Sequence, residues 1–564
     1  MSISSISLGG RLSAAFLLTA ALAACEGDTG PAGPAGPEGP PGAPGAPGGI
    51  DPEASTADKA FVGLGGEDVI TGLTSFSIQA EGTRLMLGEG FEPEGGSETV
   101  SSFSSTTTYD LANDAFRIDW DRNFLFFGAA RVYSEVVNKD VGYVKGTDLV
   151  FLPDDQEALA AMPSDRMAAI RKEQRLLNPL LLMRDVAAAT VTASDGGPAL
   201  VNGVVYERLV IEDAVSDITL YVNPRNGQID KLETWENDQL RRDVLLEVFY
   251  ADWQVNGQVQ YPSAVFLALD GEPLHAETRT FQANATVEGD ALAIPATLDP
   301  APVFVEADAD RGMRSHQFLQ QFASLGVPNA GVQSNVVALP LDNDDPAQAK
   351  LFHLTGGTHH SLAIKQAEGV VIAEAPLYPE RSKAILAWVE TQFGAGTKVT
   401  HVIATHHHFD HTAGLREFVA AGAQIVVHEE SRAFFEGIFR APSTIVPDTL
   451  EMTPVQPKIV SVPDDGVFDL QDLGARVCAF PMNSSHAEDM MLIYVEIPGS
   501  ETVFISDIFS PGFPPNPVGA GEVLATIQDH ELTVAKIAGG HGMGTATLAE
   551  LDAIVNPPPP PPAN

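Results

Sequence analysis

The hydrophobic pattern divides the chain into two regions of different periodicity. Between residues 61 and 305, apolar and polar residues alternate as in strands, for example over Val204–Ile211, with turn residues between the segments. The pair Asn226-Gly227 is typical of a hairpin turn. One stretch, Ser164–Ala189, has helical spacing and is interrupted by a proline. The pattern predicts an antiparallel sheet curled around a helical insert.

From about residue 333 the periodicity changes to strands that alternate with helices. Val370–Glu374 is apolar enough for a buried strand, and the amphipathic segment Pro379–Phe393 follows it. This alternation predicts a second folded unit over 333–555, with 306–332 as the linker and 556–564 as a proline-rich tail. We therefore expect an α+β multidomain protein.

The first residues of the chain resemble an export signal. The apolar run Leu12–Ala24 follows Arg11 and is shorter than the roughly 20 residues that a spanning helix needs, so 1–24 is expected to be a signal peptide. Leu22-Ala23-Ala24-Cys25 resembles the bacterial lipobox, which implies a lipid-modified Cys25. The resemblance implies a protein of the bacterial cell envelope, anchored in the outer membrane on its periplasmic or surface face. An ordinary signal peptide with a chance cysteine is the alternative.

Glycine occupies every third position from Gly27 to Gly48, with mostly proline and alanine between. This is the collagen period. Seven triplets without hydroxyproline predict at most a weak trimer. The simpler interpretation of 25–60 is a lipid anchor followed by a stalk, in which the glycine repeat alone would be ~65 Å long at 3.1 Å per residue.

Charge and cysteine content exclude several functions. The chain has 32 basic and 75 acidic residues, a formal net charge of −43, which disfavours nucleic-acid binding and polybasic docking to membranes. Cys25 and Cys478 are the only cysteines, so a disulfide framework is excluded, and Cys478 is expected to be a small buried residue.

Four of the 14 histidines lie within six positions, at His406, His407, His408 and His411. They follow a predicted strand, and loops at the carboxyl ends of strands are where α/β proteins build sites. Residues two apart in extended backbone project the same way, so His406 and His408 can share one metal ion. The turn at Asp410 and His411 then directs the next two side chains toward an adjacent ion, while His407 is expected to point away.

The segment His406-x-His408-x-Asp410-His411 is similar to the signature of the metallo-β-lactamase superfamily of metallohydrolases. Three later residues match the superfamily in order: a histidine before a strand, an aspartate ending the next strand, and a histidine in a glycine-rich loop. The resemblance implies an αββα metallo-β-lactamase sandwich over 333–555 with two ions. The implied ligands are His406, His408 and His486 for one ion, Asp410, His411 and His541 for the other, and Asp507 for both.

The ligand set indicates the chemistry. Imidazole and carboxylate ligands suit two Zn²⁺ ions, with iron or manganese as alternatives. Water on such ions has a pKa near 7, so we expect hydrolysis of an ester, thioester, lactone or related bond in a small-molecule substrate. Asp410 is also a candidate proton acceptor. His359 and His360 are candidate substrate contacts, or else a structural pair.

Two other functions remain open. The passage Val244–Tyr261, followed by Pro262, resembles the lipoprotein-carrier half-barrel family of the LolA and LolB type, which implies a concave apolar surface for acyl chains. The chain would then be a lipid- or lipoprotein-binding protein with a vestigial metal domain, or the β-rich region would be a plain structural domain. A mononuclear iron enzyme that oxygenates sulfur is the other alternative.

Overall fold

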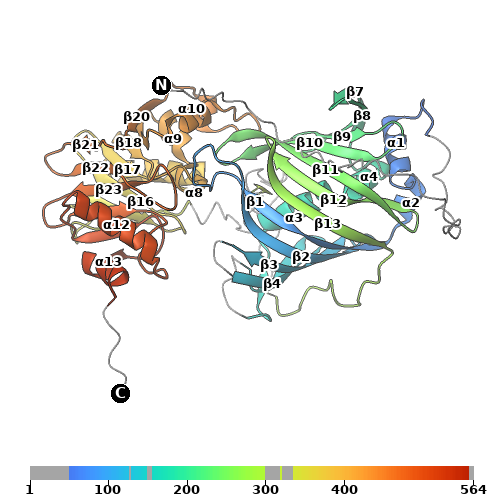
Figure 1. Ribbon diagram of the computed structural model, residues 1–564, viewed down its shortest axis with the longest axis horizontal. Coiled ribbons are helices and arrows are strands. Elements are labelled where there is room, and N and C mark those ends of the chain that lie inside the picture. Colours follow the sequence, from blue (N-terminus) through green and yellow to red (C-terminus); the bar gives the residue numbers. More distant parts are fainter. Residues whose placement is uncertain (1–49, 126–128, 149–154, 299–317, 320–333, 558–564) are drawn as a thin grey trace, which may run out of the picture. The chain divides into compact units, whose positions relative to one another are not determined.

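The computed structural model describes residues 50–125, 129–148, 155–298, 318–319 and 334–557, and the chain from Ile50 onward forms one compact unit (Figure 1). The signal peptide, Cys25, the glycine-repeat segment, nearly all of 306–332 and most of the proline-rich tail lie outside the described residues. Within them, no helix is both long and apolar enough to cross a membrane.

The first region is a single antiparallel sheet of 13 strands. The strands are β1 (Ser75–Met86), β2 (Glu98–Asp110), β3 (Ala115–Phe124), β4 (Ala129–Asn138), β5 (Val141–Gly146), β6 (Leu159–Ala161), β7 (Ala193–Val201), β8 (Val204–Ile211), β9 (Ile218–Val222), β10 (Ile229–Asp238), β11 (Arg242–Asn256), β12 (Val259–Leu269) and β13 (Glu272–Ala283). Each strand pairs with its sequence neighbours except that β6 and β7 form the two edges, and β1 pairs with β13 at the centre.

Two helices, α3 (Ser164–Leu177) and α4 (Pro179–Ala187), connect the edge strands β6 and β7 and pack against the curled sheet (Figure 1). Alternating side chains of the strands form the core between the sheet and these helices. In β11, for example, every second residue from Val244 to Tyr250 is buried. Helix α1 (Thr56–Gly63), which precedes α2 (Glu67–Gly72), begins inside the segment expected to be stalk. The Ser55 side chain caps it and Ala60 is buried, so the folded region begins before residue 61.

The second region contains two sheets. The first has β14 (Val337–Pro340), β15 (Leu351–Thr355), β16 (Ser361–Lys365), β17 (Val370–Ala373), β18 (Val399–Ile403), β19 (Gln424–His428) and β20 (Lys458–Val462). The second has β21 (Phe468–Leu470), β22 (Arg476–Pro481), β23 (Met491–Glu496), β24 (Thr502–Ile505), β25 (Lys536–Gly539) and β26 (Thr545–Ala546). The helices are α7 (Pro379–Phe393), α8 (Phe409–Thr412), α9 (Leu415–Ala420), α10 (Arg432–Arg440), α11 (Thr449–Met452), α12 (Pro517–Asp529) and α13 (Leu548–Val555).

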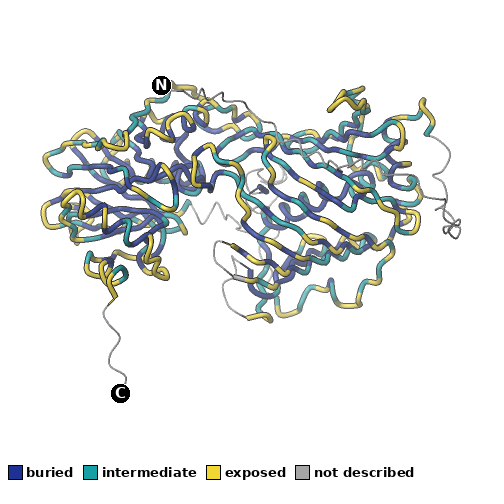
Figure 2. Tube along the Cα trace, in the orientation of Figure 1, coloured by how far each residue is buried: buried dark blue, intermediate teal, exposed yellow. Residues whose placement is uncertain are grey.

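Three apolar clusters hold these elements together. Strand β17 contributes to two of them in alternation: Val370 and Ile372 pack with α7, α9 and α10, while Val371 packs with residues of the second sheet such as Ile493. The other face of the second sheet, with buried Cys478, packs against α12 and α13. The central strands of both sheets are therefore buried on both faces, as Figure 2 shows.

The two regions also contact each other. Leu240, in the turn between β10 and β11, belongs to the cluster that contains α7, α9 and α10. Asp243 Oδ2 accepts hydrogen bonds from Thr444 N (2.7 Å) and Thr444 Oγ1 (2.6 Å), and Glu488 N donates to Phe91 O (2.8 Å). Part of the β-rich region therefore packs directly on the elements that carry the histidine motif.

Candidate metal centre

Strand ends bring the predicted ligands together. β17 and β18 are parallel neighbours in the first sheet, and β24 and β25 are parallel neighbours in the second. The histidine motif follows β18, Asp507 follows β24 and His541 follows β25. Because parallel strands end at the same edge, the ligands converge there.

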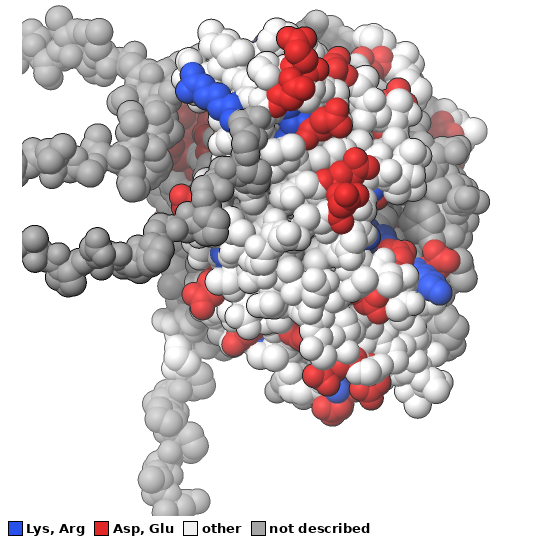
Figure 3. Space-filling model, turned by 90° about the vertical axis from the view of Figure 1, so that its right-hand side faces the viewer, with Lys and Arg blue, Asp and Glu red and all other residues white. Residues whose placement is uncertain are grey.

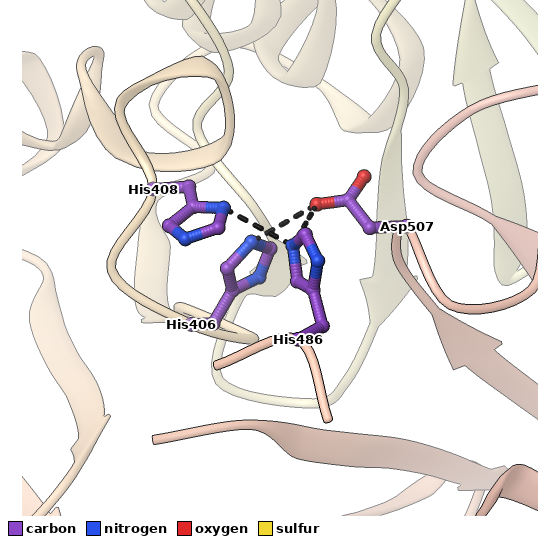
Figure 4. A group of neighbouring side chains, drawn as sticks. All are labelled: His406, His408, His486 and Asp507. Carbon is purple, nitrogen blue, oxygen red and sulfur yellow. Dashed lines mark hydrogen bonds and ion pairs between the residues drawn. The ribbon is translucent and has the colours of Figure 1, made fainter. Parts of the chain in front are cut away.

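The first site contains His406, His408, His486 and Asp507 (Figure 4). His486 Nε2 lies 3.1 Å from His408 Nδ1 and 2.9 Å from Asp507 Oδ2. His406 Nε2 lies 3.0 Å from the same carboxylate oxygen. Three ring nitrogens and one oxygen thus face a common point.

The second site contains Asp410, His411, His541 and Asp507. His411 Nε2 is 3.1 Å and His541 Nε2 is 2.9 Å from Asp507 Oδ1. His411 Nε2 is also 3.2 Å from Asp410 Oδ2. Asp507 therefore directs Oδ2 to the first site and Oδ1 to the second, as a bridging carboxylate would.

The burial, hydrogen bonding and protonation of the candidate ligand atoms are compatible with metal binding. His406 Nε2, His411 Nε2 and Asp410 Oδ1 are buried, and none makes a hydrogen bond with good geometry within the described residues. Burial lowers the pKa of His406 to about 3, so its imidazole is neutral and able to bind metal. Burial opposes the charged form of His541 as well, but Asp410 and Asp507 outweigh it and raise its pKa to about 10. A divalent cation would replace that proton between the same carboxylates.

One buried carboxylate orients ligands of both sites. Glu374 Oε2 accepts a hydrogen bond from His411 Nδ1 (2.9 Å), and Oε1 accepts one from Thr405 Oγ1 (2.6 Å). Thr405 Oγ1 in turn lies 3.0 Å from His406 Nδ1. Because the hydroxyl proton points to Glu374, the Nδ1 of His406 is the donor, which leaves Nε2 free for a metal. The sequence left the role of Glu374 open.

The remaining predicted residues have different positions. His407 points away from both sites, as expected: its Nδ1 is 2.7 Å from Asp489 Oδ1. His359 lies beside the second site, with Nε2 2.9 Å from Asp410 Oδ2. His360 is buried against His353, with ring centroids 4.8 Å apart.

Sequence reasoning missed two neighbours of the motif, both from the β-rich region. His408 Nε2 donates to Gly90 O (2.9 Å), and Glu89 Oε2 lies 3.7 Å from His408 Nδ1. Both residues belong to residues 87–97, here called the β1–β2 loop. Nothing in the local sequence, Gly88-Glu89-Gly90, distinguishes it from an ordinary acidic turn.

Convergent histidines and aspartates at parallel strand ends make this region a candidate metal-binding domain. Residues 379–536 match the family model described as the metallo-beta-lactamase superfamily, so this part of the chain is a domain of that superfamily. The match contains every ligand above except His541. None of the curated proteins that were compared matches the chain.

Several solved structures resemble part of the chain at low identity. The metallo-beta-lactamase from Pontibacter korlensis is 14% identical over 39% of this chain and 98% of its own, with a TM-score of 0.29. An archaeal metallo-beta-lactamase superfamily protein from Sulfolobus tokodaii is 14% identical over 39% of this chain and 85% of its own (TM-score 0.26). The chemotaxis sensor ODP, solved as a peroxy diiron species, is 16% identical over 39% and 93% (TM-score 0.28).

Proposed function

We propose that the chain is a dinuclear metallohydrolase that cleaves an ester, thioester, lactone or related bond. The observation that carries the proposal is the orientation of Asp507, with one oxygen toward each group of histidines. When bound, two divalent cations, zinc by preference and iron or manganese as alternatives, would supply Lewis acidity that activates water and polarises the scissile bond.

The protein's own groups have distinct tasks in this proposal. Asp410 Oδ1 is buried without a hydrogen bond in the described structure and is the proposed proton acceptor for the attacking water. His359 holds the other oxygen, Oδ2. Burial, with help from His541, lowers the pKa of His359 to about 4, so it remains neutral at pH 7.

A cavity of about 230 Å³ next to Asp507 supports a small-molecule substrate. It is lined by the segment from Ile508 to Asn516 and by residues near β26 and α13. Exposed Phe513 stands next to it, with its ring 6.5 Å from that of His541. An apolar part of the substrate would pack there.

The lipid-binding alternative has weaker support. The interior of the curled sheet contains buried ion pairs, including Arg84 with Glu173 and Arg166 with Glu135 (2.6 Å). A larger cavity, about 900 Å³, lies against β1–β3 and β11–β13 and is lined mainly by polar side chains such as Thr106. The buried ion pairs do not favour an acyl chain.

The proposed setting is the bacterial envelope, with a lipid on Cys25 as the anchor and the glycine-repeat segment as a stalk or weak trimer. Acidic side chains are spread over the face in Figure 3 with fewer basic ones, which supports small-molecule rather than nucleic-acid partners. Cys25→Ser should move the protein from the membrane fraction to the soluble fraction. Unchanged fractionation would rule out this anchor.

Asp507→Ala tests the centre. Purified wild-type protein should contain two metal equivalents by elemental analysis and hydrolyse at least one member of an ester, thioester, lactone and lactam panel. Asp507→Ala should lose metal at both sites and all hydrolysis, whereas Asp465→Ala, at an exposed turn, should lose neither. Full metal content in Asp507→Ala would refute the bridging role, and one iron per chain would favour sulfur oxygenation.

A further inference from the structure

The β1–β2 loop of the β-rich region reaches the metal centre of the other region. Glu89 forms a third group of possible ligands with His408 and Asp410, in which one ligand atom of each lies within 4.8 Å of the others. Its side chain is only 14% exposed, and Glu89 Oε1 is buried without a hydrogen bond within the described residues. Such an atom has lost its water without gaining a protein partner.

The same loop also fixes a ligand of the first site. The Gly90 carbonyl can only accept, so His408 Nε2 must carry the proton in their 2.9 Å hydrogen bond. The lone pair of His408 is then on Nδ1, the atom that faces His486. Backbone from a region 318 residues away in sequence thus selects the tautomer that can bind metal.

The loop is held firmly enough for this task. Phe91 O accepts a hydrogen bond from Glu488 N (2.8 Å), two residues after His486, so the loop contacts both histidine-bearing segments of the first site. Its flanking strands, β1 and β2, lie in the middle of the 13-stranded sheet. Gly88 supplies the backbone turn, with a φ of 89° that favours glycine.

Charge gives the third argument. Glu89, Asp410 and Asp507 bring three carboxyl groups to one buried centre, and carboxylate oxygens are ligands that divalent cations accept. Two divalent cations would bring four positive charges to the site. The arrangement therefore favours the metal-loaded state.

We infer that Glu89 is an additional oxygen ligand of the ion bound through His408, supplied by the β-rich region together with the Gly90 carbonyl that orients this histidine. The inference rests on the proposed function. In this inference both regions supply ligands to the metal centre, so the β-rich region takes part in metal binding.

The test compares full-length wild type, Glu89→Gln and Glu94→Gln after metal removal. Glu94 is an exposed acid in the same loop and serves as the matched control. Zn²⁺ affinity is measured by chelator competition, and Co²⁺ absorption reports the ligands. Glu89→Gln should bind one of the two ions 10- to 100-fold more weakly, the range for loss of groups that support a metal, with an altered Co²⁺ spectrum. Glu94→Gln should match wild type.

Thermal unfolding separates ligation from structural support. Without metal, Glu89→Gln should melt at about the wild-type temperature, because the substitution keeps the size of the side chain, while its stabilisation by Zn²⁺ should be smaller. Wild-type affinity for both ions, or a lower melting temperature of the metal-free variant, would overturn the inference. Failure of the wild type to bind two ions would instead refute the proposed dinuclear function.

Discussion

Glu374→Gln is a sharp perturbation of the centre because it keeps the volume of the side chain and removes one acceptor. The carboxylate accepts from Thr405 Oγ1 and from His411 Nδ1 at the same time, and an amide has only one oxygen. If the amide nitrogen faces Thr405, the hydroxyl proton must turn away and the tautomer of His406 is no longer fixed. If the amide nitrogen faces His411, its N–H group and the Nδ1–H of His411 are both donors, and no hydrogen bond can form between them.

The magnitude follows from these contacts. Ser506 Oγ lies 3.1 Å from His411 Nδ1 and can replace an acceptor there, so we expect the first site to suffer more. A hydrogen bond to a charged group is worth about 1.5–3 kcal/mol, which corresponds to roughly 10- to 100-fold in metal affinity. Glu374→Gln should therefore hold one Zn²⁺ near wild-type strength and the other more weakly by that factor.

Zn²⁺ titration of the metal-free full-length protein against a chelator measures both affinities, with the exposed Glu390→Gln of α7 as control. Far-ultraviolet circular dichroism confirms that each variant is folded. Two ions bound at wild-type affinity in Glu374→Gln would show that this carboxylate does not orient the ligands. An equal loss in Glu390→Gln would attribute the effect to net charge.

Two other substitutions separate metal binding from folding. His407→Ala should keep two ions but lower the free energy of unfolding by about 1–3 kcal/mol, since the buried partner Asp489 loses its hydrogen bond; loss of metal from the folded protein would contradict this. Burial by itself raises the pKa of Asp448, but the hydrogen bonds from Arg416 prevail and lower it. Its contribution to stability is therefore present above pH 4 and lost as pH falls through the lowered pKa. In urea unfolding, the destabilisation caused by Asp448→Asn should shrink from pH 6 to pH 3, and a constant difference would refute the role of the charge.

Local spacing predicted that His406 and His408 share a site, and the resemblance to the metallo-β-lactamase signature implied the later candidate ligands. His406 and His408 are two apart in extended backbone, and Asp507 and His541 directly follow buried strands, so chain direction and sheet geometry constrain them. The alternation of apolar and polar residues also predicted the antiparallel sheet and its helical insert. Asn226-Gly227 does lie between β9 and β10, in a loop over residues 223–228. These features depend on a few neighbouring residues.

Features that depend on tertiary contact were not predictable in this way. The pairing of β1 with β13 joins strands at opposite ends of the region, and the pattern of apolar and polar residues does not predict it. Glu374 ends a predicted strand, but its hydrogen bond to Thr405 and its backbone φ of 64° are not visible in the sequence. The first part of helix α1, residues 56–60, was predicted to belong to the stalk, and the burial of Ala60 that places it in the folded region depends on tertiary contacts.

The contacts of the β-rich region bear on how the chain should be divided. Removing residues before Gln317 would delete Leu240 from an apolar cluster of the metal region, Asp243 from the backbone of Thr444, and the Gly90 carbonyl from His408. The first two losses affect stability and the third affects metal binding, because a free imidazole populates both tautomers. We therefore expect the segment from Gln317 onward to be less stable than the full chain and to bind one ion more weakly, even with all seven predicted ligands present. Equal metal affinity and equal melting temperature in the two forms would show that the regions are energetically independent.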